Sequence, residues 1–238
     1  DAAGLIANQI LFTAINSLVD AQGGADDITG MVGIDWALTA DNGALSSTPY
    51  QFVNIETADL VNQSLNGTDA NSETFTITTA DNAVNVNAID LVQVSAINAG
   101  TSSNDEIIAT GSAVNAALTS SDNGLTASTI DFSNINNADL NGGELIGTNG
   151  NDETFTITST DNAVNVNDID FTQVSAIDAG SSASDSIVAS GSAVNAELTS
   201  SNNGLTASTI NFSNINDADL NGGELTGTNS NDETFTIT

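Results

Sequence analysis

The chain has 238 residues and a net charge of −31, because it contains 31 Asp and Glu residues and no Lys, Arg or His. This charge excludes nucleic-acid binding, since no side chain can neutralise phosphate, and it excludes binding to an anionic membrane surface. No apolar run approaches the roughly 20 residues of a membrane-spanning helix, so we expect no membrane insertion. Hydrophobic residues make up 39% of the chain, which is enough for a core and distinguishes it from a disordered acidic tail.

The composition also removes most kinds of chemistry. Without His, Cys, Lys or Arg, neither the common catalytic groups nor a His/Cys zinc site can be built. A pair of carboxyl groups remains, as in glycoside hydrolysis, but one Trp and one Tyr offer little surface for stacking on a sugar. We therefore expect no enzyme activity. Carboxylate oxygens do suit hard cations, so Ca²⁺ is the expected cofactor, with solubility in a salty medium as the alternative role of the charge.

Residues 1–68 are a diverged first copy of a repeat that dominates the chain. Within them, apolar residues at helical spacing predict an amphipathic helix over 2–20, either capping the repeat core or docking to a neighbour. These residues are Leu5, Ile6, Ile10, Leu11, Ala14, Ile15, Leu18 and Val19. Further on, Phe52–Leu60 matches Phe132–Leu140. Terminal repeats are often atypical because they cap an array.

Two closely similar copies follow, at 69–148 and 149–228. They share 60 identities over 80 positions without a gap. In the first of them, alternation of apolar and polar residues predicts strands over 74–78, 83–87, 89–97, 106–109, 113–118, 128–135 and 144–146. The intervening Asn-Gly and Gly-Gly pairs, such as Asn123-Gly124 and Asn141-Gly142-Gly143, predict tight turns. The chain is therefore expected to be all-β outside the helix.

Two architectures fit strands that come about every ten residues. One is a β-solenoid and the other is a string of small β-sandwich domains, for which 80 residues is also a plausible size. Small inward residues, an aromatic share of 4% and frequent Asn favour the solenoid, because they suit thin and regular layers better than a thick core.

Residues 229–238 begin a further repeat. Glu233–Thr238 repeats the Glu-Thr-Phe-Thr-Ile-Thr sequence of Glu73–Thr78, whereas Asp1 aligns just after that sequence. One hypothesis is that Glu233, Thr234, Phe235, Thr236, Ile237 and Thr238 complete the first repeat of another copy by donor-strand complementation. Such a head-to-tail contact does not close on itself and produces a filament. The alternative is a longer repeat protein interrupted at an arbitrary point.

Several turns resemble the haemolysin-type calcium-binding repeats of secreted bacterial proteins. They are Gly147-Thr-Asn-Gly-Asn-Asp152, its copy ending at Asp232, and the stretches Asp20–Asp27 and Asp178–Asp185. In that family Gly-rich turns and Asp side chains bind Ca²⁺ between successive coils. The candidate ligands are Asp20, Asp26, Asp27, Asn98, Asp105, Asn151, Asp152, Asp178, Asp185, Asn231 and Asp232. Asp, Asn and Gly are also good turn formers, which is the simpler explanation of each turn.

A broader similarity is to repeat regions of bacterial adhesins and surface-layer proteins. It implies an extracellular or cell-surface location. We expect a structural subunit that polymerises with itself and is stabilised by Ca²⁺. The alternatives are a calcium-binding spacer or ligand-binding region of a giant adhesin or surface-layer protein, and an ice-binding face built from Thr-x-Thr rows.

Overall fold

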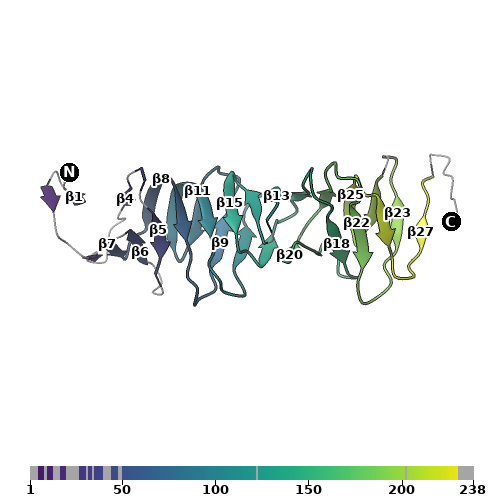
Figure 1. Cartoon of the computed structure of the whole chain (residues 1–238), viewed down its shortest axis with the longest axis horizontal. Coiled ribbons are helices and arrows are strands. Elements are labelled where there is room, and N and C mark those ends of the chain that lie inside the picture. The colour runs from purple at the N-terminus through teal and green to yellow at the C-terminus, as the bar shows by residue number, and fades with distance from the viewer. Residues whose placement is uncertain are drawn as a thin grey trace.

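The structure is a computed structural model that describes residues 5–7, 10–12, 17–19, 27–30, 32–33, 35–39, 44–47, 50–121, 123–201 and 203–229. Every regular element in these residues is a β-strand. Figure 1 shows an elongated rod in which the strands run across the long axis, with the N-terminal strands at one end and β27 near the other. The chain is a β-solenoid, as the sequence predicts.

Two long sheets enclose the core of the rod. Sheet I contains, in order of pairing, β3 (Ser17–Val19), β7 (Tyr50–Val53), β6 (Ala44–Ser47), β5 (Trp36–Leu38), the second halves of β8 (Thr57–Asn66) and β11 (Ile89–Asn98), β15 (Ile130–Ser133), β14 (Leu125–Ala127), β13 (Ala116–Leu118), β17 (Glu144–Ile146), β21 (Ala176–Asp178), β25 (Ile210–Ser213), β24 (Leu205–Ala207), β23 (Ala196–Leu198) and β27 (Leu225–Thr226). Sheet II contains β4 (Asp27–Thr29), the first halves of β8 and β11, β10 (Val84–Val86), β9 (Thr74–Ile77), β12 (Glu106–Ala109), β16 (Asn137–Asp139), β20 (Ile169–Thr172), β19 (Val164–Val166), β18 (Thr154–Ile157), β22 (Ser186–Ala189) and β26 (Asp217–Asp219).

Pairing between the sequence repeats distinguishes the solenoid from a string of separate sandwiches. β12 and β16 belong to residues 69–148 and β20 belongs to 149–228, yet the three are hydrogen-bonded neighbours in sheet II. In sheet I, β17 and β21 cross the same boundary. Both sheets are therefore continuous from one repeat to the next, and the repeats share one core.

Each half of an 80-residue repeat carries an antiparallel meander on the coil. β9, β10 and the first half of β11 form one, and β13, β14 and β15 form the next. The last two strands of each meander are joined by two residues with positive φ, such as Asn87 (52°) with Ala88 (63°) and Ser128 (47°) with Thr129 (61°). Two central residues with positive φ define a type I′ turn, whose twist matches that of a tight hairpin.

Alternation along the strands places one side of each sheet in the core. In β9, Phe75 and Ile77 are fully buried while Thr74 is exposed. The Phe75 ring from sheet II meets the Phe132 ring from sheet I edge-on at 6.1 Å, and an equivalent contact recurs one repeat later between Phe155 and Phe212 at 6.3 Å. These ring pairs hold the two sheets against each other.

The described residues of the segment 2–20 form strands and not the expected helix. They are β1 (Leu5–Ala7), β2 (Ile10–Phe12) and β3, and β1 pairs with β2 in an antiparallel arrangement. The prediction was wrong for these residues because short apolar runs fit a helix and a hairpin equally well, and the strands have hydrogen-bond partners: β1 and β2 pair with each other, and β3 pairs with β7. The hairpin register, Leu5 opposite Phe12, repeats that of Val84 opposite Leu91.

Candidate functional site

The candidate cation ligands from the sequence differ in burial. Asp27, Asn98, Asn151 and Asp152 are exposed, Asp178 is half-buried, and Asp105 and Asp185 are buried. Asp20, Asp26, Asn231, Asp232 and the assembly residues Glu233–Thr238 lie outside the described residues. Across the part of the chain that is described, no three Asp, Glu, His or Cys side chains gather into a group suited to a metal ion.

The exposed members of this set contact polar groups of neighbouring coils. Asp178 Oδ1 accepts hydrogen bonds from Asn214 Nδ2 at 2.7 Å and from Gly180 N at 3.0 Å. Asn98 Oδ1 takes the equivalent bond from Asn134 at 2.7 Å, and the Ser182 hydroxyl donates to Asp152. These hydrogen bonds link successive turns of the solenoid.

Glycine in these turns permits close stacking of coils. Gly147 N donates to Asp178 O at 2.7 Å, and a Cβ at Gly147 would lie 2.4 Å from the carbonyl oxygen of Ala179. That separation is far below van der Waals contact. Gly147 is therefore required by the approach of the next coil, and a glycine here does not by itself indicate a cation site.

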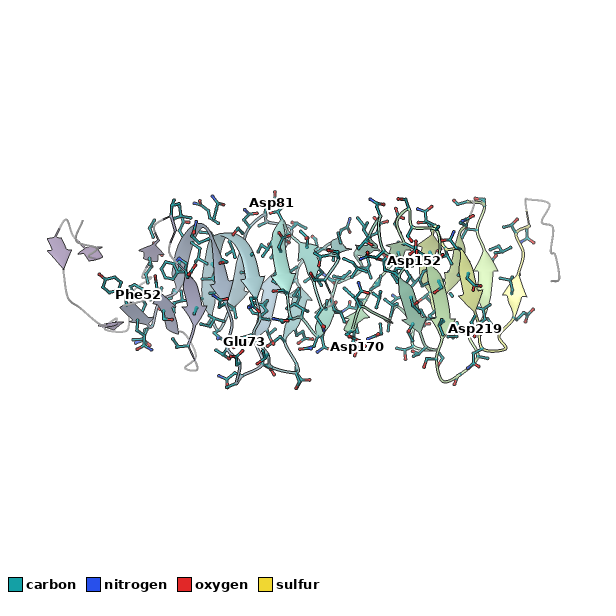
Figure 2. All side chains as sticks on the ribbon, in the orientation of Figure 1. Phe52, Glu73, Asp81, Asp152, Asp170 and Asp219 are labelled. Atoms are coloured by element: carbon teal, nitrogen blue, oxygen red, sulfur yellow. The ribbon has the colours of Figure 1, made fainter. Side chains whose placement is uncertain are left out.

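Two buried carboxyl groups meet at the start of the neighbouring strands β9 and β12. We call Glu73, Asp105 and Asn136 the first acid corner. Asp105 Oδ1 accepts from Glu73 N at 2.8 Å, and Asn136 Oδ1 accepts in turn from Asp105 N at 3.0 Å. Glu73 Oε1 accepts from the Thr68 hydroxyl at 2.6 Å. Figure 2 places Glu73 on the opposite edge of the rod from Asp81, which follows β9.

The second oxygens of both carboxyl groups have no partner. Glu73 is 2% exposed and Asp105 is fully buried, and neither Glu73 Oε2 nor Asp105 Oδ2 accepts a hydrogen bond. Burial, which disfavours the charged form, raises the pKa of both carboxyl groups, and the charge of Asp105 raises the pKa of Glu73 further. Two ionised carboxylates only accept hydrogen bonds, so neither can be the hydrogen-bond partner of the other unless one of them carries a proton.

The second acid corner repeats this geometry 80 residues later. It consists of Glu153 (2% exposed), Asp185 (0%) and Asn216, with Glu153 N donating to Asp185 Oδ1 at 2.9 Å. Glu153 Oε2 and Asp185 Oδ2 are again unpartnered. Burial raises the pKa of Glu153, and the Asp185 charge adds to the effect.

Next to each pair, a neutral side chain makes the same kind of backbone hydrogen bond. Asn136, just before β16, accepts from Asp105 N as Asp105 accepts from Glu73 N, and Asn216 accepts from Asp185 N in the same way. An amide oxygen is therefore sufficient for this strand-to-strand hydrogen bond. The carboxyl groups of sheet II do something that the hydrogen bond alone does not require.

The sequence predicts Asp105 and Asp185 as candidate cation ligands, but it does not indicate Glu73 and Glu153 as their partners. The separation within each pair is 32 residues, which is one turn of the solenoid at this position. That length cannot be read from a sequence that repeats every 80 residues, so the pairing had no signal before the fold was known.

The Thr-x-Thr segments do not align into a continuous Thr surface. In sheet II, Thr76 lies between Asn85 on β10 and Ile108 on β12. Rows of stacked Thr, which the ice-binding alternative requires, are therefore absent at this strand.

The C-terminal coil leaves core residues uncovered. Leu225 of β27 is 44% exposed, whereas Leu145, its equivalent one repeat earlier, is fully buried. Ala218 is likewise exposed although its equivalent Ala138 is 1% exposed. We call Ala218, Leu220 and Leu225 the end face. Within the described residues, β26 pairs with β22 alone and β27 with β23 alone.

Comparison with known proteins gives no match: no family model, no curated protein and no solved structure is significantly similar to this chain. In the described residues there is no helix with the length and apolar character needed to cross a bilayer.

Proposed function

We propose that this chain is a structural, non-enzymatic protein of the extracellular space or cell surface, whose copies join head to tail into a filament or matrix stabilised by Ca²⁺. The observation that carries the proposal is the end face, where Leu225 is 44% exposed while its buried equivalent Leu145 is covered by β21. A further coil of the same kind is the natural cover for this surface.

The N-terminal strands have the pairing geometry of such a coil. β3 pairs with β7 as the second half of β11 pairs with β15, and β4 pairs with β8 as β12 pairs with β16. β3 and β4 precede their equivalents by 79 positions, and β7 and β8 precede theirs by 80. The β2 and β3 strands thus correspond to the strands that cover β16 and β17 inside the chain.

The proposal fixes the register of the contact. If a second copy continues both sheets, Leu18 of that copy lies opposite Leu225, as Ile177 lies opposite Leu145. Phe12 of that copy lies opposite Ala218, as Phe171 lies opposite Ala138. Apolar residues meet the exposed apolar residues of the end face in both sheets, and burial of such surface is the main driving force of association.

Strand donation extends the same contact. Among the described residues β1 pairs only with β2, whereas its equivalent β10 pairs with β11 and also with the Thr-Phe-Thr-Ile strand β9. Glu233–Thr238 repeats the sequence of β9. In the proposed filament this segment adds to β1 of the next copy, with Ile237 opposite Leu5 by analogy with Ile77 opposite Val84.

Electron microscopy and sedimentation velocity of the purified chain over a wide concentration range test the proposal. We expect concentration-dependent polymers that Leu225→Asp abolishes. Ile146→Asp is the matched control, because Ile146 is 38% exposed on an internal strand and the substitution adds the same charge. A chain that remains monomeric at all concentrations would refute head-to-tail assembly and favour a spacer within a longer adhesin or surface-layer protein. Truncation after Asp232 tests strand donation separately, since unchanged assembly would remove that part alone.

A further inference from the structure

We propose that each acid corner is a specific Ca²⁺ site, with one ion held between Glu73 and Asp105 and another between Glu153 and Asp185. This deepens the proposed function, since it moves the stabilising cation from the Gly-rich surface turns to two buried corners of sheet II. The stabilisation by Ca²⁺ is the part of the proposed function on which it rests.

Each acid corner contains two unpartnered carboxylate oxygens. Four carboxylate oxygens, two in each corner, are buried without a hydrogen-bond partner in a chain that has no basic side chain to pair with them. Leaving two like charges together in a low-dielectric interior is strongly unfavourable. A divalent cation supplies both missing charges and accepts the free lone pairs of both residues at once. Carboxylate oxygens are the preferred ligands of Ca²⁺.

A neutral side chain next to each pair makes the same backbone hydrogen bond. Asn136 and Asn216 accept from Asp105 N and Asp185 N with an amide oxygen. Asp105 and Asp185 accept from Glu73 N and Glu153 N in the same way. A carboxyl group at 105 and 185 is therefore not needed for this hydrogen bond. Among the described residues, the buried carboxyl groups are these four, two in each of the two similar repeats.

The two carboxylates of a corner set the expected affinity. Ca²⁺ affinity rises with the number of charged ligands and with the rigidity of the site, and extracellular modules bind with dissociation constants on the order of 10⁻⁴–10⁻³ M. We expect each corner to fall in this range. Mg²⁺ should bind more weakly, because it gives up its water shell reluctantly and demands strict octahedral geometry.

Isothermal titration with Ca²⁺ on the full chain, at an ionic strength that screens the surface charge, tests the proposal. We expect Asp105→Asn to remove one bound ion and the double variant Asp105→Asn/Asp185→Asn to remove two. The substitution keeps Oδ1 as an acceptor, so the fold should persist. Glu73→Gln, which leaves the Glu73 N to Asp105 Oδ1 bond in place, is the second variant if Asp105→Asn does not fold.

Asp131→Asn is the matched control, because it also removes one carboxylate and the equivalent residue of the next repeat is naturally Asn211. It should leave the number of bound ions unchanged. Equal ion numbers in the corner variants and the wild type would overturn the proposal. So would a chain whose melting temperature does not respond to Ca²⁺, since each pair would then share a proton instead. Repeating the titration in the Leu225→Asp chain separates binding from assembly: loss of polymers with retained Ca²⁺ binding would support the corners independently of the filament.

Discussion

The contact between Phe155 and Phe212 offers the sharpest test of the two-sheet arrangement. The two rings come from β18 in sheet II and β25 in sheet I, 57 positions apart, and they meet edge-on at 6.3 Å and 66°. Both are almost completely buried, at 0% and 2% exposure. Phe155→Ala should therefore lower the free energy of unfolding by about 3–5 kcal/mol, which combines the lost transfer free energy with the cavity left behind. About 0.5–1.5 kcal/mol of the stability should belong to the ring contact itself.

A double-mutant cycle isolates that share. Phe155→Leu, Phe212→Leu and the double variant are compared by denaturant unfolding followed by circular dichroism, and we expect a coupling of about 0.5–1.5 kcal/mol. Phe75→Leu combined with Phe212→Leu is the control, since Phe75 has its ring contact with Phe132 and the two effects should add within about 0.5 kcal/mol. Fluorescence of Trp36, the single Trp, shows whether the N-terminal coils unfold together with the rest. No coupling between Phe155 and Phe212 would refute the facing of sheets I and II.

Three further predictions concern stability. Gly147→Ala should lower the free energy of unfolding by about 1–3 kcal/mol in denaturant unfolding, because the new Cβ would lie 2.4 Å from Ala179 O. Gly150→Ala is the control and should have little steric effect, because the space around Gly150 is open. Equal losses of stability in the two variants would contradict close stacking of the coils at Gly147. Ala88→Gly should stabilise by about 1 kcal/mol, because Ala88 is exposed at φ 63° in a type I′ turn; a lower melting temperature would contradict this, and Ala88→Val should be destabilising. In excess chelator the melting temperature should fall as pH rises above 4.5, the ordinary pKa of Glu. Burial raises the folded-state pKa of Glu73 and Glu153. The stability that these protonated groups provide at low pH is therefore lost as pH rises through the raised pKa. Glu73→Gln/Glu153→Gln should flatten this slope, and a slope unchanged by the substitutions would assign it to other groups.

Much of the fold could be predicted from the sequence, because strand alternation is a local signal. The strands predicted over 106–109 and 144–146 have those bounds in the structure. The strand predicted over 74–78 is one residue shorter at its end, and the one predicted over 83–87 is one residue shorter at both ends. The three residues of β14, Leu125–Ala127, were not predicted as a strand. The segment 2–20 was misassigned because its apolar spacing fits helix and hairpin alike.

The acid corners could be predicted only in part, because they depend on long-range register. The sequence predicts Asp105 and Asp185 as candidate cation ligands, whereas Glu73 belongs to the repeated strand sequence Glu73–Thr78. What joins Glu73 to Asp105 is the length of one coil, and the sequence repeats at a different length from the coil. A periodic sequence thus reveals that a solenoid repeats without revealing which residues stack.

The difference between the two lengths follows from how the chain winds. In each half-repeat the chain crosses between the sheets three times: from the meander to the next strand, then to the last strand, and then to the following meander. Because three is odd, the next half-repeat begins on the other sheet, as β9 and β18 in sheet II and β13 and β23 in sheet I show. Two half-repeats are needed to return to the same environment, so the sequence repeats every 80 residues while the strand pattern repeats twice as often. This is why Glu73 and Glu153 both fall in sheet II, whereas the register places Val114 and Val194 at the corresponding positions of sheet I. Insertion of one half-repeat would exchange the sheets for every residue beyond it, and only whole repeats keep the acid corners in sheet II.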